Sequence, residues 1–389
     1  MQQHPSDKLP MSHSWTVFGL FWLAVYLSPL LVFTARTLRG RIVGLTGACF
    51  QFLLVWPFAN QFIWSIGEFY CYMCYFYLAL FPLLFSMAAL LKPKKQPGLP
   101  NDLTVVGDGA DFRRYLKRVF WAEEDWLWTG VLLGTMLDWR VSRPRGAEIR
   151  ARVQGVLDDM RYVGVYKHCR TPWIHVFDSE YEHYPASIFV VPDQAPRGAV
   201  IFLHGHGGNT LFQAFLLREF ARKYRLIVMC PTFSFGPWEL PQAKAMVYKA
   251  VDVLKTNFDI APQQTFLAGL SQGAAGVAVA AHIDSFAGLV FLSPTMIEKD
   301  LIAKPFVAAW QGREVLVIHG AQDRHVIRKS VDAGITAMVR HGITVQASFH
   351  PHADHSLFLL DTEEVLGEVG AYCERHLPEV PDDGTHPVA

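Results

Sequence analysis

The chain has 389 residues, and its 35 Lys and Arg residues balance 35 Asp and Glu residues, so the formal net charge at pH 7 is zero. A neutral chain gives no argument for nucleic acid as a partner, because that partner requires a basic surface. The length suffices for one large domain and an appendage. Charge is unevenly distributed, with six Asp, Glu, Lys or Arg residues among the first 91 and 64 among the 298 that follow.

Three charge-free runs fill the first 91 residues, at positions 9–35, 42–67 and 69–91. Each exceeds the roughly 20 residues that a helix needs to cross a bilayer. The apolar part of the first run, at 15–33, and each of the other two runs contain one proline, which membrane helices tolerate when neighbouring helices satisfy the freed backbone groups. We therefore predict a membrane region of about three transmembrane helices. A buried helical bundle is the alternative, but such a bundle needs a polar outer face, which these runs lack.

Basic residues predict the orientation of this region. Two clusters flank the apolar runs: Arg36, Arg39 and Arg41, and Lys92, Lys94 and Lys95. Three crossings put both clusters on one side, which the positive-inside rule assigns to the cytoplasm. We therefore predict an integral membrane protein whose C-terminal domain is cytoplasmic. The six cysteines suggest no disulfide framework, which agrees with that location.

The next segment, residues 92–160, begins with a linker rich in Lys, Pro and Gly at 92–100. Residues 112–139 mix basic and aromatic side chains, and their uncharged part is too short to span a bilayer. We predict a helix that either lies on an anionic membrane face or packs on the domain that follows. Residues 147–160 have the pattern of another amphipathic helix.

Strand and helix patterns alternate through residues 161–389. Strands are predicted at 162–169, 186–191, 199–203, 226–230, 265–268, 288–292, 314–319 and 344–349, with helices at 211–224 and 243–258. This alternation predicts an α/β fold with a mostly parallel sheet covered by helices on both faces. The segment between Leu292 and Glu314 has room for a helix but not for a large lid, so we predict an open site.

A glycine-rich loop, His-Gly-His-Gly-Gly-Asn, follows the strand predicted at 199–203. Glycines let backbone N–H groups approach a substrate oxygen closely. We predict an oxyanion hole formed by the N–H groups of Gln272 and His206, with Gly207 as the alternative second donor. A turn without a ligand is the other interpretation. A phosphate-binding loop is disfavoured, because the Lys-Ser/Thr ending is missing.

Aromatic residues after the fourth predicted strand are expected to shape the substrate site. They are Phe233, Phe235 and Trp238. Packing in the core is the equal alternative for this aromatic run.

Residues 269–273 read Gly-Leu-Ser-Gln-Gly, a G-x-S-x-G motif between a predicted strand and a predicted helix of small residues. A serine at such a junction sits on a sharp, strained turn with its hydroxyl exposed. The flanking Gly269 and Gly273 allow that turn. Ser271 is therefore the candidate nucleophile. Because a serine hydroxyl is a poor nucleophile at neutral pH, it needs a base and an acid that orients the base.

Asp323 is the candidate acid. The apolar run at 314–319 predicts a buried strand, and it ends in Gly-Ala-Gln-Asp. A carboxylate in a loop at the carboxyl end of a strand lies where α/β sheets place their sites. The alternative is that Asp323 caps the next helix, which is predicted to begin near Val326.

The candidate base lies among three histidines that follow the last predicted strand: His350, His352 and His355. His350 still lies close to the strand, whereas His355 precedes Ser-Leu-Phe, where the last helix could begin. We therefore choose His355 and keep His352 as its rival. A zinc site built from this group of His and Asp residues is a further alternative. It has little support, because no second ligand group of matching spacing occurs elsewhere.

In chain order, these motifs resemble the α/β-hydrolase superfamily: H-G-x-G-G at 204–208, G-x-S-x-G at 269–273, G-x-x-D at 320–323 and D-H-S at 354–356. The resemblance covers about residues 160–377. The G-L-S-Q-G elbow is similar to the G-F-S-Q-G of carboxylesterases and acyl-protein thioesterases. The superfamily implies a triad of Ser271, Asp323 and His355, a covalent acyl-enzyme and no cofactor. It also contains peptidases, depolymerases, acyltransferases and a few inactive members.

The sequence thus predicts an α/β-hydrolase sheet covered by helices and preceded by an all-α transmembrane region. The predicted parts are a membrane region at 1–91, a linker with amphipathic helices at 92–160 and a hydrolase domain at 161–389. The predicted function is a membrane-anchored serine hydrolase that cleaves ester or thioester bonds of a small-molecule or lipid substrate. The alternatives are a peptidase or acyltransferase on the same triad, and a non-catalytic membrane protein that binds through a hydrolase fold.

Overall fold

The computed structural model describes residues 103–106, 123–162, 187–206, 210–231, 238, 241–283 and 285–377. The predicted membrane region, residues 1–91, lies outside these residues. Within the described ranges, no helix combines the length and the apolar character needed to cross a bilayer. The chain divides into two compact units, one of residues 1–97 and 111–133 and one of residues 98–110 and 134–389. The boundaries predicted at 91 and 160 remain predictions.

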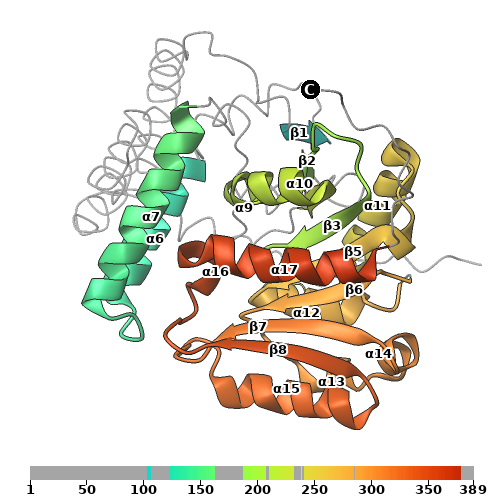
Figure 1. Cartoon of the computed structure of the whole chain (residues 1–389). Helices are drawn as coiled ribbons and strands as arrows, with labels where there is room; N and C mark the ends of the chain where they lie inside the picture. Colours follow the sequence, from blue (N-terminus) through green and yellow to red (C-terminus); the bar gives the residue numbers. More distant parts are fainter. Residues whose placement is uncertain are drawn as a thin grey trace, which may run out of the picture. The chain divides into compact units, whose positions relative to one another are not determined.

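Among the described residues, an eight-stranded mixed sheet forms the centre of the second unit (Figure 1). Its strands are β1 (Leu103–Val106), β2 (Ser187–Val190), β3 (Gly198–Leu203), β4 (Leu226–Pro231), β5 (Thr265–Leu270), β6 (Gly288–Leu292), β7 (Glu314–Gly320) and β8 (Thr344–His350). Their order across the sheet is β1-β2-β4-β3-β5-β6-β7-β8. Strand β2 runs antiparallel to β1 and β4, and every other pair is parallel. The predicted α/β class with a mostly parallel sheet is confirmed.

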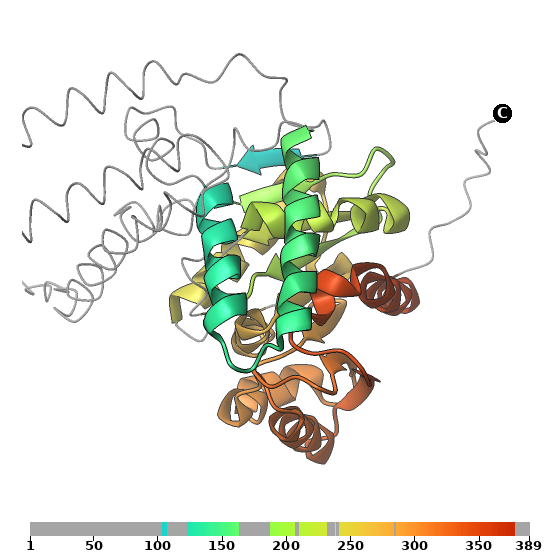
Figure 2. The same cartoon turned by 90° about the vertical axis from the view of Figure 1, so that its left-hand side faces the viewer.

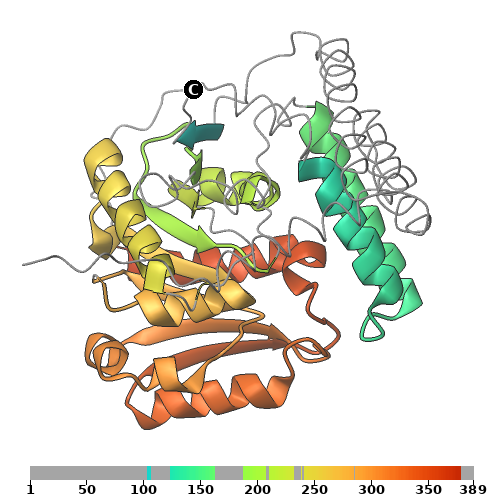
Figure 3. The ribbon, with the colours of Figure 1, turned by 180° about the vertical axis from the view of Figure 1, so that it is seen from behind.

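Helices cover both faces of this sheet. The helices of the second unit are α7 (Arg143–Tyr162), α9 (Thr210–Leu216), α10 (Arg218–Tyr224), α11 (Pro241–Phe258), α12 (Gln272–Ala280), α13 (Glu298–Leu301), α14 (Lys304–Trp310), α15 (Arg328–Arg340), α16 (Leu357–Leu360) and α17 (Thr362–His376), whereas α6 (Glu123–Leu137) lies mostly in the first unit. Helices α11 to α15 share one apolar core with alternate residues of β3 to β7, and Figure 3 shows α11 and α12 in front of the sheet on that side. On the opposite face Phe202 stacks on Phe358 of α16, and Phe266 meets Tyr372 of α17.

Helix α7 is an amphipathic helix that begins and ends slightly outside the predicted range of 147–160. Its buried residues are Val153, Val156, Leu157 and Met160. It packs against α9 and α16, so it belongs to the same compact unit as the sheet. The two interpretations offered for residues 112–139 concern α6, and the choice between them stays a prediction.

Three sequence predictions differ from the structure. Strand β1 lies inside the segment for which we predicted only a linker and helices. The helix predicted at 211–224 is two helices, interrupted at the buried Leu217. A strand was predicted from Tyr162, but Tyr162 is the last residue of α7, and residues 163–169 lie outside the described ranges. A four-residue edge strand and a one-residue helix break leave little periodicity to detect.

Parallel strands bring distant loops to one edge of the sheet. Ser271 directly follows β5, Asp323 follows β7, and His355 follows β8. Because β5, β6, β7 and β8 are consecutive neighbours and run parallel, their carboxyl ends lie side by side. Ligand sites of open α/β sheets form at this edge.

Candidate active site

Ser271 occupies a strained turn between β5 and α12. Its backbone has φ 53° and ψ −113°, a conformation that side-chain-bearing residues rarely adopt. A Cβ added to Gly269 would lie 2.4 Å from the carbonyl carbon of Gly273, and one added to Gly273 would lie 2.2 Å from the Leu203 oxygen. The backbone N–H of Ser271 donates to the Leu292 carbonyl at 2.8 Å. The small flanking residues are therefore a steric requirement of this turn.

A chain of hydrogen bonds joins Ser271, His355 and Asp323. His355 Nε2 lies 3.0 Å from Ser271 Oγ, and His355 Nδ1 lies 2.6 Å from Asp323 Oδ2. When Nδ1 carries the imidazole proton it donates to Asp323, and Nε2 is then free to accept from the serine hydroxyl. The structure thus brings together the three side chains that the sequence nominated as nucleophile, base and acid.

The Asp323 carboxylate is buried, and its two oxygens have different partners. Oδ1 accepts from the backbone N–H groups of His325 at 2.7 Å and Val326 at 2.9 Å, whereas Oδ2 faces His355. Burial raises the pKa of Asp323, but the hydrogen bonds from His355, Val326 and His325 outweigh it, so the pKa is lowered overall. Helix α15 begins only at Arg328, so Asp323 stabilises the turn before the helix rather than capping it.

A second buried histidine, His319, lies near this carboxylate. Its Nδ1 is 3.9 Å from Asp323 Oδ2, and burial lowers its pKa, so the ring is neutral near pH 7. Neither ring nitrogen of His319 has a hydrogen-bond partner among the described residues. Among the described residues, the His355 ring is therefore the one imidazole that is hydrogen-bonded to the Asp323 carboxylate.

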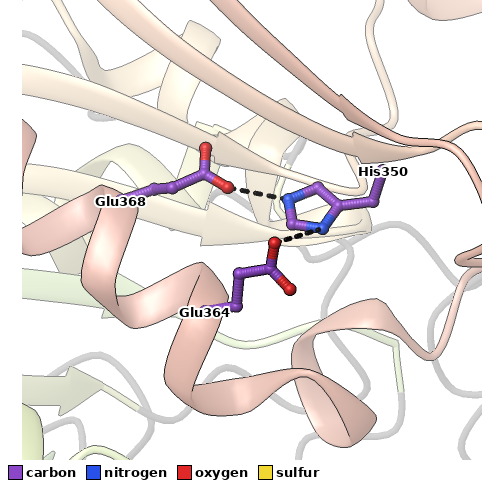
Figure 4. Close-up of side chains that lie close together, drawn as sticks. All are labelled: His350, Glu364 and Glu368. Atoms are coloured by element: carbon purple, nitrogen blue, oxygen red, sulfur yellow. Dashed lines mark hydrogen bonds and ion pairs between the residues drawn. The ribbon is translucent and has the colours of Figure 1, made fainter.

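The other two histidines of the 350–355 segment do not contact Ser271. His350 Nε2 pairs with Glu368 at 2.8 Å and its Nδ1 faces Glu364 at 3.7 Å, both on α17 (Figure 4). His352 is exposed, and no hydrogen bond or ion pair links it to the part of the chain that the structure describes. Of the three candidates, His355 is thus the one that is placed to act on the serine.

His350, Glu364 and Glu368 are also the one group in the described ranges whose ligand atoms, all within 4.8 Å of one another, could hold a metal ion. The carboxylates of Glu364 and Glu368 approach different nitrogens of the His350 ring, whereas a metal ion binds to only one nitrogen of a ring (Figure 4). As they stand, their polar contacts attach α17 to the end of β8. The zinc alternative for the sequence cluster is not favoured by this arrangement.

The predicted oxyanion donors lie next to Ser271. A Cβ added to Gly205 would lie 3.6 Å from the Ser271 Cβ, so the loop after β3 passes beside the nucleophile. His206 Nδ1 lies 3.2 Å from Gln272 Oε1, which brings two of the predicted donor residues together. Gln272 is the first residue of α12, where helix N–H groups have no partner within the helix. Gly207 lies outside the described residues.

Trp238 packs against His204, the first residue of this loop. It is fully buried, its indole N–H donates to the His204 carbonyl at 2.8 Å, and its ring contacts the His204 ring edge-on. Burial lowers the pKa of His204 to about 4, so the imidazole between Trp238 and the loop is neutral. Trp238 therefore matches the core-packing alternative rather than an open substrate surface. Phe233 and Phe235 lie outside the described ranges.

Sequence reasoning missed a group of residues that surrounds His355. His325 stacks on the His355 ring, Asp138 binds His325, and Arg145 binds Asp354, the residue before His355. Asp138 and Arg145 belong to the segment assigned to a linker and amphipathic helices. Asp138 directly follows α6 and Arg145 lies in the first turn of α7, and single charges at such positions are common on solvated helix surfaces.

No known protein-family model matches the sequence, and no curated protein matches it. Several solved structures resemble it. A hyperthermophilic esterase from the archaeon Pyrobaculum calidifontis has a TM-score of 0.41 and 16% identity, covering 49% of this chain and 81% of its own. The Francisella virulence factor BioJ has a TM-score of 0.44 and 15% identity, covering 62% and 98%. The HSL homologue EstE7, from a metagenome library, has a TM-score of 0.42 and 15% identity, covering 50% and 83%. At TM-scores this low, we base the functional assignment on this chain's own side chains.

Replacement of Gly273 by alanine tests the steric requirement at the turn. The added methyl group would meet backbone atoms, so we expect destabilisation at the upper end of the range of about 1–3 kcal/mol that overpacking costs. Gly367→Ala in α17 is the matched control, because its Cβ meets nothing within 4 Å. That control should be stabilising by about 0.5–1 kcal/mol. Urea unfolding of both variants measures the difference, and equal effects would contradict the packing described here.

The lowered pKa of Asp323 predicts how stability depends on pH. The unfolded state takes up the proton first, near an ordinary pKa of about 3.9, whereas the folded state resists it. The contribution of Asp323 is therefore fully present above that value and is lost as pH falls through the lower folded pKa. Asp323→Asn should flatten the fall of unfolding free energy between about pH 5 and pH 2. The exposed Asp159→Asn in α7 should leave the slope unchanged, and identical slopes for both variants would refute the assignment.

Proposed function

We propose that this chain is a membrane-anchored serine hydrolase of the α/β-hydrolase type that cleaves carboxylic ester or thioester bonds. One observation carries the proposal: an unbroken hydrogen-bond chain leads from the buried Asp323 through His355 to Ser271 on its strained turn. The order nucleophile, acid and histidine along the chain, with the nucleophile between a strand and a helix, is that of α/β-hydrolases. A binding module has no need of this arrangement.

In the proposed mechanism Ser271 Oγ attacks the substrate carbonyl while His355 Nε2 takes the hydroxyl proton. The carboxylate of Asp323 holds the imidazole and stabilises the imidazolium that forms. The N–H group of Gln272, together with that of His206 or Gly207, stabilises the oxyanion. His355 then gives its proton to the leaving alcohol or thiol. The acyl group stays bound to Ser271 Oγ. Water, deprotonated by His355, attacks this acyl-enzyme. His355 then returns that proton to Ser271 Oγ as the acyl–oxygen bond breaks and the carboxylic acid leaves.

The substrate class follows from the location that the sequence predicts. Three long apolar runs in residues 1–91 favour an anchor in the bilayer. An esterase held at a membrane meets lipophilic esters and thioesters at high local concentration. Phe233 and Phe235, which follow the fourth predicted strand in the sequence, are the side chains that we propose to contact the acyl chain. We therefore propose lipid or other lipophilic esters as substrates.

Reaction with a fluorophosphonate probe tests the nucleophile and its base. The wild type should be labelled at one serine, and Ser271→Ala should lose this labelling completely. His355→Gln should slow labelling by at least about a hundredfold, because the hydroxyl loses its base. His352→Gln is the matched control and should react like the wild type. Labelling that survives in Ser271→Ala would mean that another residue is the nucleophile, and an unreactive folded wild type would overturn the enzyme assignment.

Extraction of membranes at alkaline pH tests the anchor. The full-length protein should stay with the membrane pellet, because transmembrane helices resist carbonate extraction, whereas peripheral proteins are released. A tag at the C-terminus should be digested by protease only after the cells are opened, as expected for a cytoplasmic domain. Release into the supernatant would contradict the anchor, and digestion of the tag in intact cells would contradict the orientation.

A further inference from the structure

The short connection between α6 and α7, residues 138–142, lies against the loops that carry the acid and the histidine. Figure 2 shows this connection beside the loop that follows β8. Asp138 contacts His325 in the loop after β7, which carries Asp323 and is called the acid loop. Arg145, in the first turn of α7, contacts Asp354 in the loop after β8, which carries His355 and is called the histidine loop. These contacts join residues that are 187 and 209 positions apart in the sequence. The segment before the predicted hydrolase domain therefore takes part in building the candidate site.

Asp138 holds the His325 ring. Its Oδ2 lies 2.9 Å from His325 Nε2, and both side chains are partly buried. Arg140 donates two hydrogen bonds to the same carboxylate, from Nε to Oδ1 and from Nη2 to Oδ2, each at 2.8 Å. The hydrogen bond from Arg140 keeps the pKa of Asp138 far below its ordinary range, so the carboxylate remains ionised. The charges of Asp138 and Arg140 nearly cancel. We therefore expect the pair to affect His325 by fixing the position of its ring more than by an electrostatic field.

The His325 ring in turn stacks on the His355 ring. Their ring centroids are 5.0 Å apart, and the ring planes are inclined by 30°. Asp323 fixes one edge of the His355 ring through Nδ1, and His325 covers one of its faces. A ring that is held at an edge and on a face cannot easily rotate away from Ser271. His325 is itself fixed at both ends, by its backbone N–H to Asp323 and by its side chain to Asp138.

Arg145 secures the backbone next to His355. Its Nε donates to Asp354 Oδ2 at 2.9 Å, and Asp354 Oδ1 accepts from the backbone N–H and the hydroxyl of Ser356. Burial raises the pKa of Asp354, but the hydrogen bonds from Ser356 and Arg145 outweigh it, so the pKa is lowered and the residue is ionised. The residues on both sides of His355 are thereby fixed to α7. Helix α7 is a firm support, because four of its apolar side chains are buried and it packs on α9 and α16.

We propose that Asp138, Arg145 and His325 are positioning residues, which together hold the His355 imidazole in the orientation that reaches Ser271. The proposal rests on the proposed function in treating His355 as the catalytic base. It goes further in making residues 138–145, which precede the hydrolase domain, a part of the active site. Removal of the Asp138 side chain keeps both partners of the hydrogen bond between His355 and Asp323 but frees the His325 ring that covers the imidazole.

The rate of fluorophosphonate labelling measures this positioning in the full-length protein. Asp138→Ala and His325→Ala should each lower the labelling rate constant by about ten- to a hundredfold, as small displacements of reacting groups do. The double variant should lose no more than the stronger single variant, because both changes break one chain of contacts. Asp138→Asn, which keeps an oxygen that can accept from His325, should recover part of the rate. The exposed Asp159→Asn is the matched control and should react like the wild type.

A merely structural role would give a different result. Such a role would reduce the amount of protein that becomes labelled, while the folded fraction would still react at the wild-type rate. Labelling of Asp138→Ala at the wild-type rate constant, whatever its final amount, would overturn the proposal. Ser271→Ala run in parallel shows whether the labelled residue is the proposed nucleophile.

A spectroscopic measurement separates this proposal from the proposed function. The Nδ1 proton of His355, held between the ring and Asp323, should give a low-field proton resonance that is absent from His355→Gln. Asp138→Ala should broaden or remove this resonance through faster exchange, and Asp159→Asn should preserve it. This outcome would support the positioning role even if the wild type proved unreactive toward the probe. An unchanged resonance in Asp138→Ala would reject it even if the enzyme were active.

Discussion

The buried carboxylate of Asp323 is the group on which the candidate site depends. Burial of a charge is costly unless hydrogen bonds replace those that water would make. Both oxygens of Asp323 have such hydrogen bonds. One oxygen accepts two backbone N–H groups and fixes the acid loop, and the other orients His355. The same residue therefore shapes its own loop and sets the direction of the base.

The parallel pairing of β7 with β8 makes this contact possible. The loops that leave these neighbouring strands are joined by backbone hydrogen bonds, from Ala321 N–H to the His350 carbonyl and from Gln322 N–H to the Ala353 carbonyl, both at 2.9 Å. A Cβ on Gly320 would lie 2.5 Å from the Ala353 carbonyl oxygen, so the two chains approach as closely as a glycine allows. Ser271 arrives from β5, and its strained turn aims the hydroxyl at the histidine that these loops carry.

The features that could be predicted from the sequence are those with local signals. The G-x-S-x-G motif needs only its own glycines and the strand and helix beside it. Asp323 is predictable because it follows a recognisable buried strand, and His355 because it follows the last strand pattern of the chain. Strand β1 is too short for a periodic pattern, and it gains its place only by pairing with β2. The burial of Trp238 depends on a hydrogen bond to His204, which no pattern within the aromatic run indicates. The support that Asp138 gives to His325 depends on two segments that meet only in the folded chain.

The measurement that tests the central claim most directly is the trapping of the acyl-enzyme. The full-length protein would be mixed with a slowly deacylated ester, quenched in acid within the first turnover and digested for mass spectrometry. We predict that the acyl mass appears on the peptide that contains Ser271 and that none is found in Ser271→Ala. Hydrolysis of the ester with no covalent adduct, or an adduct on another residue, would contradict the account.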